Sequence, residues 1–297
     1  MLHEAFYWLA CMSITGAICG LAVMLMRLIP KIPRRVSVLF WLIPLIRLTV
    51  PFGIKGKWTL MDLTAFLHSR EIPFPALDGA FSSMNHVGAA QTHYPIDYRT
   101  ETLKRVFEIS GIIWLIGAAA LVIAFFLLYF ASLKELKDAT PRGEIFYSPK
   151  INCPAVYGVF KPRIILPEGS DAKELVILHE RTHIKRLDNL FRIIAFITAA
   201  IHWFNPLAWV FLKHYLADTE LACDEAVLAK CGEERKKDYA TALLSYAESK
   251  NAFVSAFGGA TIRTRIEKIL NYKKLTLFSA VILCIFVFAV FYVLLAN

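Results

Sequence analysis

The stretch ELVILHERTHIKRLDN (Glu174–Asn189) decides how the central part of this chain folds. Its aliphatic residues predict a helix with an apolar face, and His179, Glu180 and His183 interrupt that face. Side chains four residues apart point from one side of a helix, so both imidazoles can reach one ion about 2.0–2.1 Å from each nitrogen. The stretch therefore predicts a helix that carries two metal ligands.

Glu180 lies beside the two histidines, which gives the H-E-x-x-H spacing. Zinc held by two such histidines lowers the pKa of a water toward about 7, and the neighbouring glutamate can take the proton of that water. The alternative is a pair of helix-face histidines that are hydrogen-bonded in a core or at a membrane surface.

A third ligand is predicted in DTELACDEAVLAKC (Asp218–Cys231), where Glu220 and Asp224 are also four residues apart. Glu220 can complete the coordination, and Asp224 can accept the second ring N–H of a ligating histidine. A solvated acidic helix face is the alternative, and the neighbours Cys223 and Glu225 leave the choice open on spacing alone.

The composition is that of an integral membrane protein. Of 297 residues, 57% are hydrophobic and only 19% are charged, and the mean hydropathy is +0.52. Three stretches without Asp, Glu, Lys or Arg are long enough to cross a bilayer, and a fourth contains Arg47. The predicted spans are Ala5–Met26, Val36–Ile54, Ile109–Leu133 and Leu275–Asn297.

Basic residues predict the orientation of these spans. The short loop Arg27–Arg35 carries four basic residues and no acidic one, and such loops stay in the cytosol. Both termini are then expected outside and the long segment 134–274 inside. A further apolar stretch, Ile193–Leu212, contains Pro206 and would reverse the last span if it crossed fully, so we expect it to dip into the membrane as a helical hairpin.

We therefore expect a mainly α integral membrane protein with four transmembrane helices and a cytosolic α+β domain. Residues 1–54 would form two spans with a short cytosolic loop, 55–108 an external loop, 109–133 the third span, 134–274 the cytosolic domain including 193–212, and 275–297 the fourth span. Alternating β-branched and aromatic residues in Glu144–Pro167 predict two or three short strands.

The net charge of +9 is explained by inner-face anchors, and no motif of a nucleic-acid-binding protein is present, so direct nucleic-acid binding is not expected. The six cysteines form no C-x-x-C pair. They lie in predicted spans or on the cytosolic side, where thiols stay reduced, so they are interpreted as small buried residues.

Three segments together resemble the membrane-bound zinc metallopeptidases of the BlaR/MecR-like, β-lactam sensor-transducer family. They are ILHERTHIKRLDNL, HWFNPLAWV and ELACDEAVL, in that order. The pair of H-E-x-x-H and E-x-x-x-D motifs is more distantly similar to the CAAX prenyl proteases and to HtpX-like proteases. The resemblance implies a gluzincin-like protease domain with His179, His183 and Glu220 as zinc ligands, Glu180 as general base and Asp224 behind the ligands.

The resemblance also implies a function in the bacterial cytoplasmic membrane. Such proteins transduce signals that regulate antibiotic resistance, and the expected substrate is a cytosolic regulatory protein such as a DNA-binding repressor. Self-cleavage is expected in the linker around Ser255, Ala256 and Phe257. A housekeeping protease of the HtpX kind and a non-enzymatic zinc-bound transducer remain the alternatives.

Family members that sense antibiotics continue into an external penicillin-binding domain, whereas this sequence stops at Asn297 and its external loop has no S-x-x-K motif. We therefore expect either that a separate sensor subunit supplies the signal or that this sequence is a truncated one, and a homodimer is a further expected assembly. A peptide substrate can add to a strand edge in Ala155–Leu166, or those strands only brace the zinc helix. Tyr239, His214 and Arg192 are equal candidates for the donor that stabilises the oxyanion.

Overall fold

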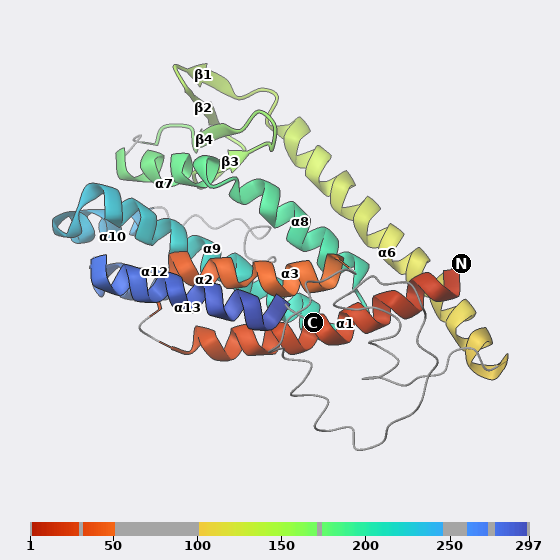
Figure 1. Cartoon of the computed structure of the whole chain (residues 1–297). Coiled ribbons are helices and arrows are strands. Elements are labelled where there is room, and N and C mark those ends of the chain that lie inside the picture. Colours follow the sequence, from red (N-terminus) through yellow and green to blue (C-terminus); the bar gives the residue numbers. More distant parts are fainter. Residues whose placement is uncertain are drawn as a thin grey trace.

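The structure is a computed structural model that describes residues 2–29, 32–50, 101–170, 174–245, 260–272 and 277–295. The described chain is mostly helical, with one small sheet at one end (Figure 1). The helices are α1 (Leu2–Arg27), α2 (Arg34–Phe40), α3 (Leu42–Thr49), α6 (Glu101–Glu135), α7 (Glu174–Lys185), α8 (Asp188–Ile201), α9 (Pro206–Cys231), the short 3-10 helix η1 (Glu233–Arg235), α10 (Lys236–Leu244), α12 (Ile262–Leu270) and α13 (Leu277–Leu295). The linker residues Ser255, Ala256 and Phe257, and residues 55–100 of the predicted external loop, lie outside the described residues.

Within the described ranges, two helices are long and apolar enough to cross a membrane, through residues Ala5–Arg27 of α1 and Arg105–Lys134 of α6. Helix α13 contains a shorter apolar stretch, Val281–Leu295, that does not reach this length. Helix α6 begins at Glu101, so the last eight residues of the predicted external loop are helical.

Residues 36–50 of the predicted span Val36–Ile54 are described, and their helix is interrupted at one residue. The chain forms α2 up to Phe40, breaks at Trp41 and resumes as α3 at Leu42. Pro44 explains the break, because its ring clashes with the carbonyl four residues earlier and it has no N–H to donate to that carbonyl. The carbonyl concerned is that of Phe40, the residue at which α2 ends.

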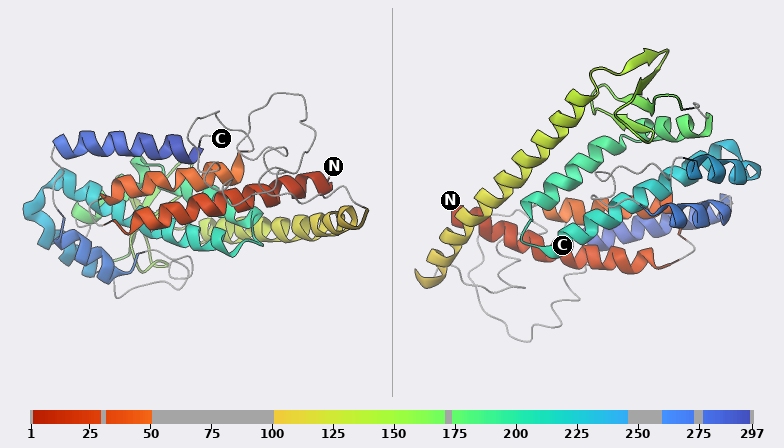
Figure 2. Two further views of the ribbon diagram at one scale, coloured as in Figure 1. Left: turned by 60° about the horizontal axis from the view of Figure 1, so that its bottom comes forward. Right: turned by 180° about the vertical axis from the view of Figure 1, so that it is seen from behind.

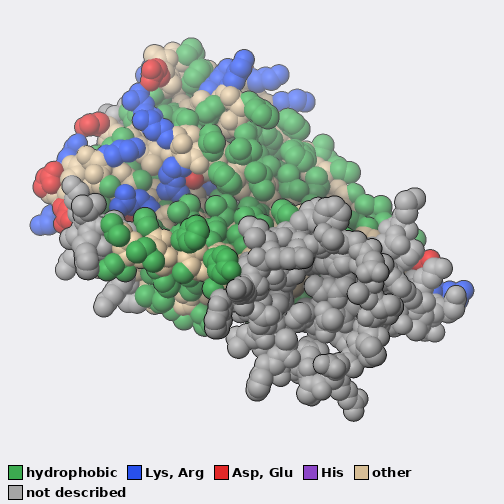
Figure 3. All heavy atoms as spheres, in the orientation of Figure 1, with side chains coloured by type: hydrophobic (Ala, Val, Ile, Leu, Met, Phe, Trp, Pro, Cys, Tyr) green, Lys and Arg blue, Asp and Glu red, His purple; other side chains and the backbone are tan. Residues whose placement is uncertain are grey.

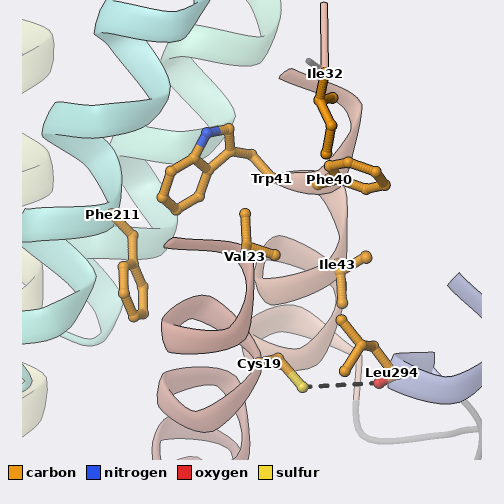
Figure 4. Close-up of a cluster of buried hydrophobic side chains, with 8 residues drawn as sticks. All are labelled: Cys19, Val23, Ile32, Phe40, Trp41, Ile43, Phe211 and Leu294. Atoms are coloured by element: carbon orange, nitrogen blue, oxygen red, sulfur yellow. Dashed lines mark hydrogen bonds between the residues drawn. The ribbon is translucent and has the colours of Figure 1, made fainter. Parts of the chain in front are cut away.

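A buried apolar cluster joins the first helices to α9 and α13. Figure 4 shows its eight residues, Cys19, Val23, Ile32, Phe40, Trp41, Ile43, Phe211 and Leu294. Arg47 of α3 is fully buried next to this cluster, where its Nε donates to the carbonyl oxygen of Leu294 at 2.9 Å. This bond offsets part of the cost of burying a charge and ties the end of α13 to α3.

Helices α8 and α9 form a hairpin that includes the segment 193–212. The chain reverses between His202 and Asn205, and the Asn205 side chain accepts a hydrogen bond from the backbone N–H of Leu207 at 2.9 Å. Pro206 follows as the first helical residue, where its fixed φ and missing N–H suit a helix start. The indole of Trp114 donates to the carbonyl of Ile201 at 2.7 Å, so α6 packs along α8, which the right-hand view of Figure 2 shows.

The sheet has the order β1-β2-β4-β3. Its strands are β1 (Thr140–Arg142), β2 (Ile145–Ser148), β3 (Ala155–Tyr157) and β4 (Arg163–Pro167), and β2 and β4 pair in parallel. Three of the four strands lie in the predicted region Glu144–Pro167. The Asn189 amide donates to the carbonyls of Val156 and Gly158 at 3.0 and 3.2 Å. Because these bonds hold β3 against the start of α8, they favour the bracing role of the strands.

Charge and apolar surface separate along the molecule. In Figure 3, Lys and Arg side chains gather at the end formed by the sheet, α7 and α10, and hydrophobic side chains cover the region below it. Many large apolar residues on α6 are about half exposed or more, among them Ile116 at 65% and Leu127 at 66%. Exposed apolar surface of this extent is typical of contact with lipid or with a partner.

Candidate metal centre

Helices α7 and α9 bring the three predicted ligands together. The Nε2 atoms of His179 and His183 are 3.1 Å apart. The Oε2 atom of Glu220 lies 3.6 Å from Nε2 of His179, and its Oε1 atom lies 3.6 Å from Nε2 of His183. Both histidines are buried, and α7 and α9 are in direct contact.

Asp188 orients the ring of His183. Its Oδ2 lies 2.6 Å from Nδ1 of His183, so the ring donates its Nδ1–H to this carboxylate. The chain reaches this position through Leu187, whose φ of 56° lies in the left-handed region that residues other than glycine rarely adopt. The strained residue Leu187, between α7 and α8, therefore places Asp188 against the ring. Strained backbone residues often occur at functional sites.

Tyr239 of α10 orients the ring of His179. Its hydroxyl donates to Oδ1 of Asp224 at 2.7 Å, and since it has one proton, it accepts from Nδ1–H of His179 at 2.8 Å. Burial and the Asp224 carboxylate raise the pKa of Tyr239 well above its usual value, so the hydroxyl keeps its proton. Asp224 itself lies 3.4 Å from the ring nitrogen, so it acts mainly through Tyr239 and not by the direct contact that the spacing predicts.

These contacts leave both Nε2 atoms facing each other. Unless a positive charge lies between them, two lone pairs and a carboxylate oppose one another within 3.6 Å. Burial lowers the pKa of His183, but Glu220, Cys223 and Asp188 together raise it to about 9, so the surroundings favour a cation. Tetrahedral donors about 2.0–2.1 Å from one ion are roughly 3.4 Å apart, and two imidazoles with one carboxylate are a donor set of catalytic zinc. The residues present fit a zinc ion.

Two arginines bracket Glu220. Arg265 of α12 binds Asp224 through Nε and Nη2 at 2.8 and 2.7 Å, and its Nη1 is 3.3 Å from Glu220. Arg192 of α8 contacts the other oxygen of Glu220 at 2.5 Å. Although burial raises the pKa of Glu220, His183, His179 and the two arginines hold it well below its usual value. The carboxylate is therefore ionised and fixed on both sides.

Arg265 was not found by sequence reasoning. It lies 86 residues from His179, and its Nη2 is nevertheless 3.2 Å from Nε2 of that ring. Its helix, Ile262–Leu270, is amphipathic and carries other basic residues, so nothing local separates Arg265 from its neighbours.

Glu180 lies on α7 beside His179 and is buried. Burial lowers the pKa of Arg192, and the charges of Glu220, Asp188 and Glu180, in that order of size, raise it. The Glu180 carboxylate therefore lies near the Arg192 guanidinium.

Among the oxyanion candidates, His214 stacks on Trp41 at 6.5 Å between ring centroids, and the Tyr239 hydroxyl is engaged with Asp224. Arg192 has a buried Nε without a partner among the described residues, which makes it the available donor.

Replacing Tyr239 with phenylalanine is expected to weaken zinc binding by about 10- to 100-fold, because the ring of His179 loses the hydroxyl that fixes its tautomer. Competition with a chelator of known affinity measures this change. Tyr147, which lies on the sheet, provides the control, and Tyr147→Phe should bind zinc as tightly as the wild type. Equal affinity of the Tyr239 variant would show that the hydroxyl does not orient the ring.

The fold and this centre place the chain in a class of mainly helical proteins with a candidate metal site between two helices. The sequence model of the family described as BlaR1 peptidase M56 matches residues 7–269. The chain belongs to this family of BlaR/MecR-like peptidases.

Three curated relatives illustrate the similarity. The regulatory protein BlaR1 of Bacillus licheniformis is 30% identical over 138 residues, which cover 42% of this chain and 23% of that protein. BlaR1 of Staphylococcus aureus is 24% identical over 288 residues, covering 84% of this chain and 48% of the relative. The methicillin resistance mecR1 protein of Staphylococcus aureus is 28% identical over 144 residues, covering 44% and 25%. The chain thus spans half or less of the length of these relatives.

Proposed function

We propose that the protein is a membrane-embedded zinc endopeptidase that hydrolyses a cytosolic regulatory protein in transmembrane signalling. The observation that carries this proposal is the convergence of His179, His183 and Glu220 within 3.6 Å in a chain of a peptidase family. These three side chains would hold the zinc, through the two Nε2 atoms and the carboxylate. When bound, the zinc supplies a Lewis acid that polarises the scissile carbonyl and makes water acidic near neutral pH.

Other residues of the chain would transfer the proton, orient the two histidine rings and bind the oxyanion. Glu180 takes the proton of the attacking water and passes it to the leaving amine. Asp188 and Tyr239 keep the Nδ1 protons on the two rings, so that both Nε2 atoms face the ion. The unpartnered Nε of Arg192 supports this residue as the donor to the substrate's developing oxyanion.

The contact between Asp218 and Arg27 supports a position of the site near the membrane surface. Arg27, at the end of α1, donates from Nε to both oxygens of Asp218 at 2.9 and 2.8 Å. Asp218 lies two residues before Glu220 on α9, so the metal site is level with the end of the first apolar helix. Because Arg27 belongs to the basic loop that should stay in the cytosol, the site faces the inner edge of the bilayer.

This placement supports the expected domain layout. We propose four spans within residues 1–54, 109–133 and 275–297, an external segment in 55–108 and a cytosolic gluzincin-like domain in 134–274, with 193–212 dipping into the membrane. The exposed apolar side chains of α6 and α13 support contact with lipid. Both termini would lie outside the bacterial cytoplasmic membrane.

The substrate class is inferred from the relatives, whose names describe a regulatory protein and a methicillin resistance protein. We propose a cytosolic repressor as substrate and a homodimer as the assembly. Self-cleavage at Ser255, Ala256 and Phe257 belongs to the same proposal.

Two other functions compete with this one. A quality-control protease of the HtpX kind would use the same centre without a signal input. A non-enzymatic zinc-bound transducer would not need Glu180, since coordination uses only the three ligands. Buried Glu180 beside His179 and near Arg192 therefore favours an enzyme over a transducer.

Removing the metal tests the proposal. Purified full chain in detergent should hold about one zinc per chain, and a chelator should abolish cleavage of the candidate repressor until zinc is restored. His183→Ala should lose both zinc and cleavage, whereas His214→Ala, which alters a histidine stacked on Trp41, should keep both. Cleavage that survives full zinc removal would contradict the proposal.

A further inference from the structure

Cys223 is a potential metal ligand that the proposed centre does not use. It lies on α9 three residues after Glu220, and none of its surface is exposed. Its Sγ and one ring nitrogen from each of His179 and His183 all lie within 4.8 Å of one another. The thiol donates to the backbone carbonyl of His179 at 3.5 Å, so it lies between α7 and α9.

The helix spacing accounts for this arrangement. On α7 the two histidines are four residues apart, and on α9 Glu220 and Cys223 are three apart, so each helix turns two donors toward the other. The two facing pairs provide four donors, which is the number of protein ligands in a closed tetrahedral zinc site. The two ring nitrogens and the carboxylate converge, and the guanidinium of Arg265 already lies 3.2 Å from Nε2 of His179, so this group of acceptors attracts positive charge.

The distances allow Cys223 to reach the ion. Zinc binds thiolate sulfur at about 2.3 Å and imidazole nitrogen at about 2.0–2.1 Å, so these donors are roughly 3.6 Å apart in a tetrahedral site. Since no separation in the cluster exceeds 4.8 Å, a movement of Sγ by about 1 Å suffices. This movement breaks the weak bond from the thiol to the backbone carbonyl of His179.

We propose that Cys223 is a fourth protein ligand that closes the zinc site in a resting form of the enzyme, an inference that rests on the proposed zinc peptidase. The metal–sulfur bond forms as the S–H bond breaks, and the proton leaves to solvent. Structural zinc sites have four protein ligands, whereas catalytic sites keep one position open for water or substrate. A site with His179, His183, Glu220 and Cys223 has no open position, so activation requires the sulfur to leave.

Cobalt(II) in place of zinc provides a readout other than activity. The full chain loaded with Co²⁺ should show the visible bands of a tetrahedral ion and, in the near ultraviolet, a sulfur-to-cobalt charge-transfer band. Cys223→Ser should lose the charge-transfer band and keep the visible bands, because the two histidines and Glu220 still hold the ion. Zinc affinity of this variant should fall by at least about tenfold, and its basal cleavage should rise.

Cys231→Ser is the matched control. Cys231 lies on the same helix, two turns further on, and its thiol contacts the neighbouring Gly232 carbonyl at 3.9 Å. This variant should keep both sets of bands. Circular dichroism and size-exclusion chromatography establish that each variant is folded, and serine changes one atom, so unfolding is not expected.

The outcomes separate the two proposals. Visible bands without a charge-transfer band in the wild type, or an unchanged charge-transfer band in Cys223→Ser, would overturn the role of Cys223 and leave the zinc peptidase intact. The absence of all cobalt bands from the wild type would overturn the zinc centre itself, and the role of Cys223 with it.

Discussion

Glu180→Gln is expected to reduce kcat for peptide cleavage by about 10³-fold while the protein keeps its zinc. Glutamine has the size of glutamate but cannot accept a proton, so the attacking water and the leaving amine lose their shuttle. The contacts that orient the proposed ligands come from Asp188 and Tyr239, not from Glu180. Zinc content and affinity should therefore stay at wild-type values.

The measurement combines metal analysis with the rate of cleavage of the candidate repressor. Glu174→Gln is the matched control, because Glu174 lies on the same helix with its side chain 78% exposed and pairs only loosely with Arg235. That variant should cleave at the wild-type rate. A Glu180 variant that keeps zinc and full activity would show that another group moves the proton. Equal inactivity of wild type and variant would favour the non-enzymatic transducer.

Asp218→Ala is expected to destabilise the protein by about 3–5 kcal/mol, because it leaves buried partners unpaired. The Asp218 carboxylate has no exposed surface and accepts hydrogen bonds from Arg27 and from the indole of Trp41 at 2.9 Å. Arg34 also lies 3.4 Å from it. Zinc affinity should fall as well, since this network fixes the part of α9 that carries Glu220.

Thermal unfolding of the purified chain in detergent measures the first effect, and chelator competition measures the second. Asp138→Ala provides the control, because Asp138 pairs with Lys150 at 3.2 Å with its side chain 81% exposed. That exposed pair should change stability by no more than about 0.5 kcal/mol. An Asp218 variant that unfolds at the wild-type temperature would show that the basic loop does not anchor α9.

The interruption between α2 and α3 is a feature that sequence reasoning did not predict. The stretch Val36–Ile54 was expected to be one span because hydropathy averages over its length. Pro44 acts on one carbonyl, and that local effect ends α2 at Phe40. The indole of the intervening Trp41 then bonds Asp218, which lies 177 residues away.

In the metal centre, too, some residues were predicted from the sequence and others were not. The spacing of His179 and His183 and that of Glu220 and Asp224 put each pair on one helix face, and the structure brings these faces together. Tyr239 was considered only as an oxyanion donor, and Asp188 and Arg265 not at all. Cys223 was interpreted as a small buried residue, although its sulfur lies beside both rings.

Features that depend on neighbours within one or two turns could be predicted from the sequence: which segments are apolar, where three of the four strands and the α8–α9 turn lie, and which donors share a helix face. These features follow from periods of two and 3.6 residues, which are local. The groups that orient the donors became visible in the folded chain, because Tyr239 and Arg265 lie 60 and 86 residues from His179. Contacts over such distances depend on how whole helices pack, and that packing is set by many side chains together.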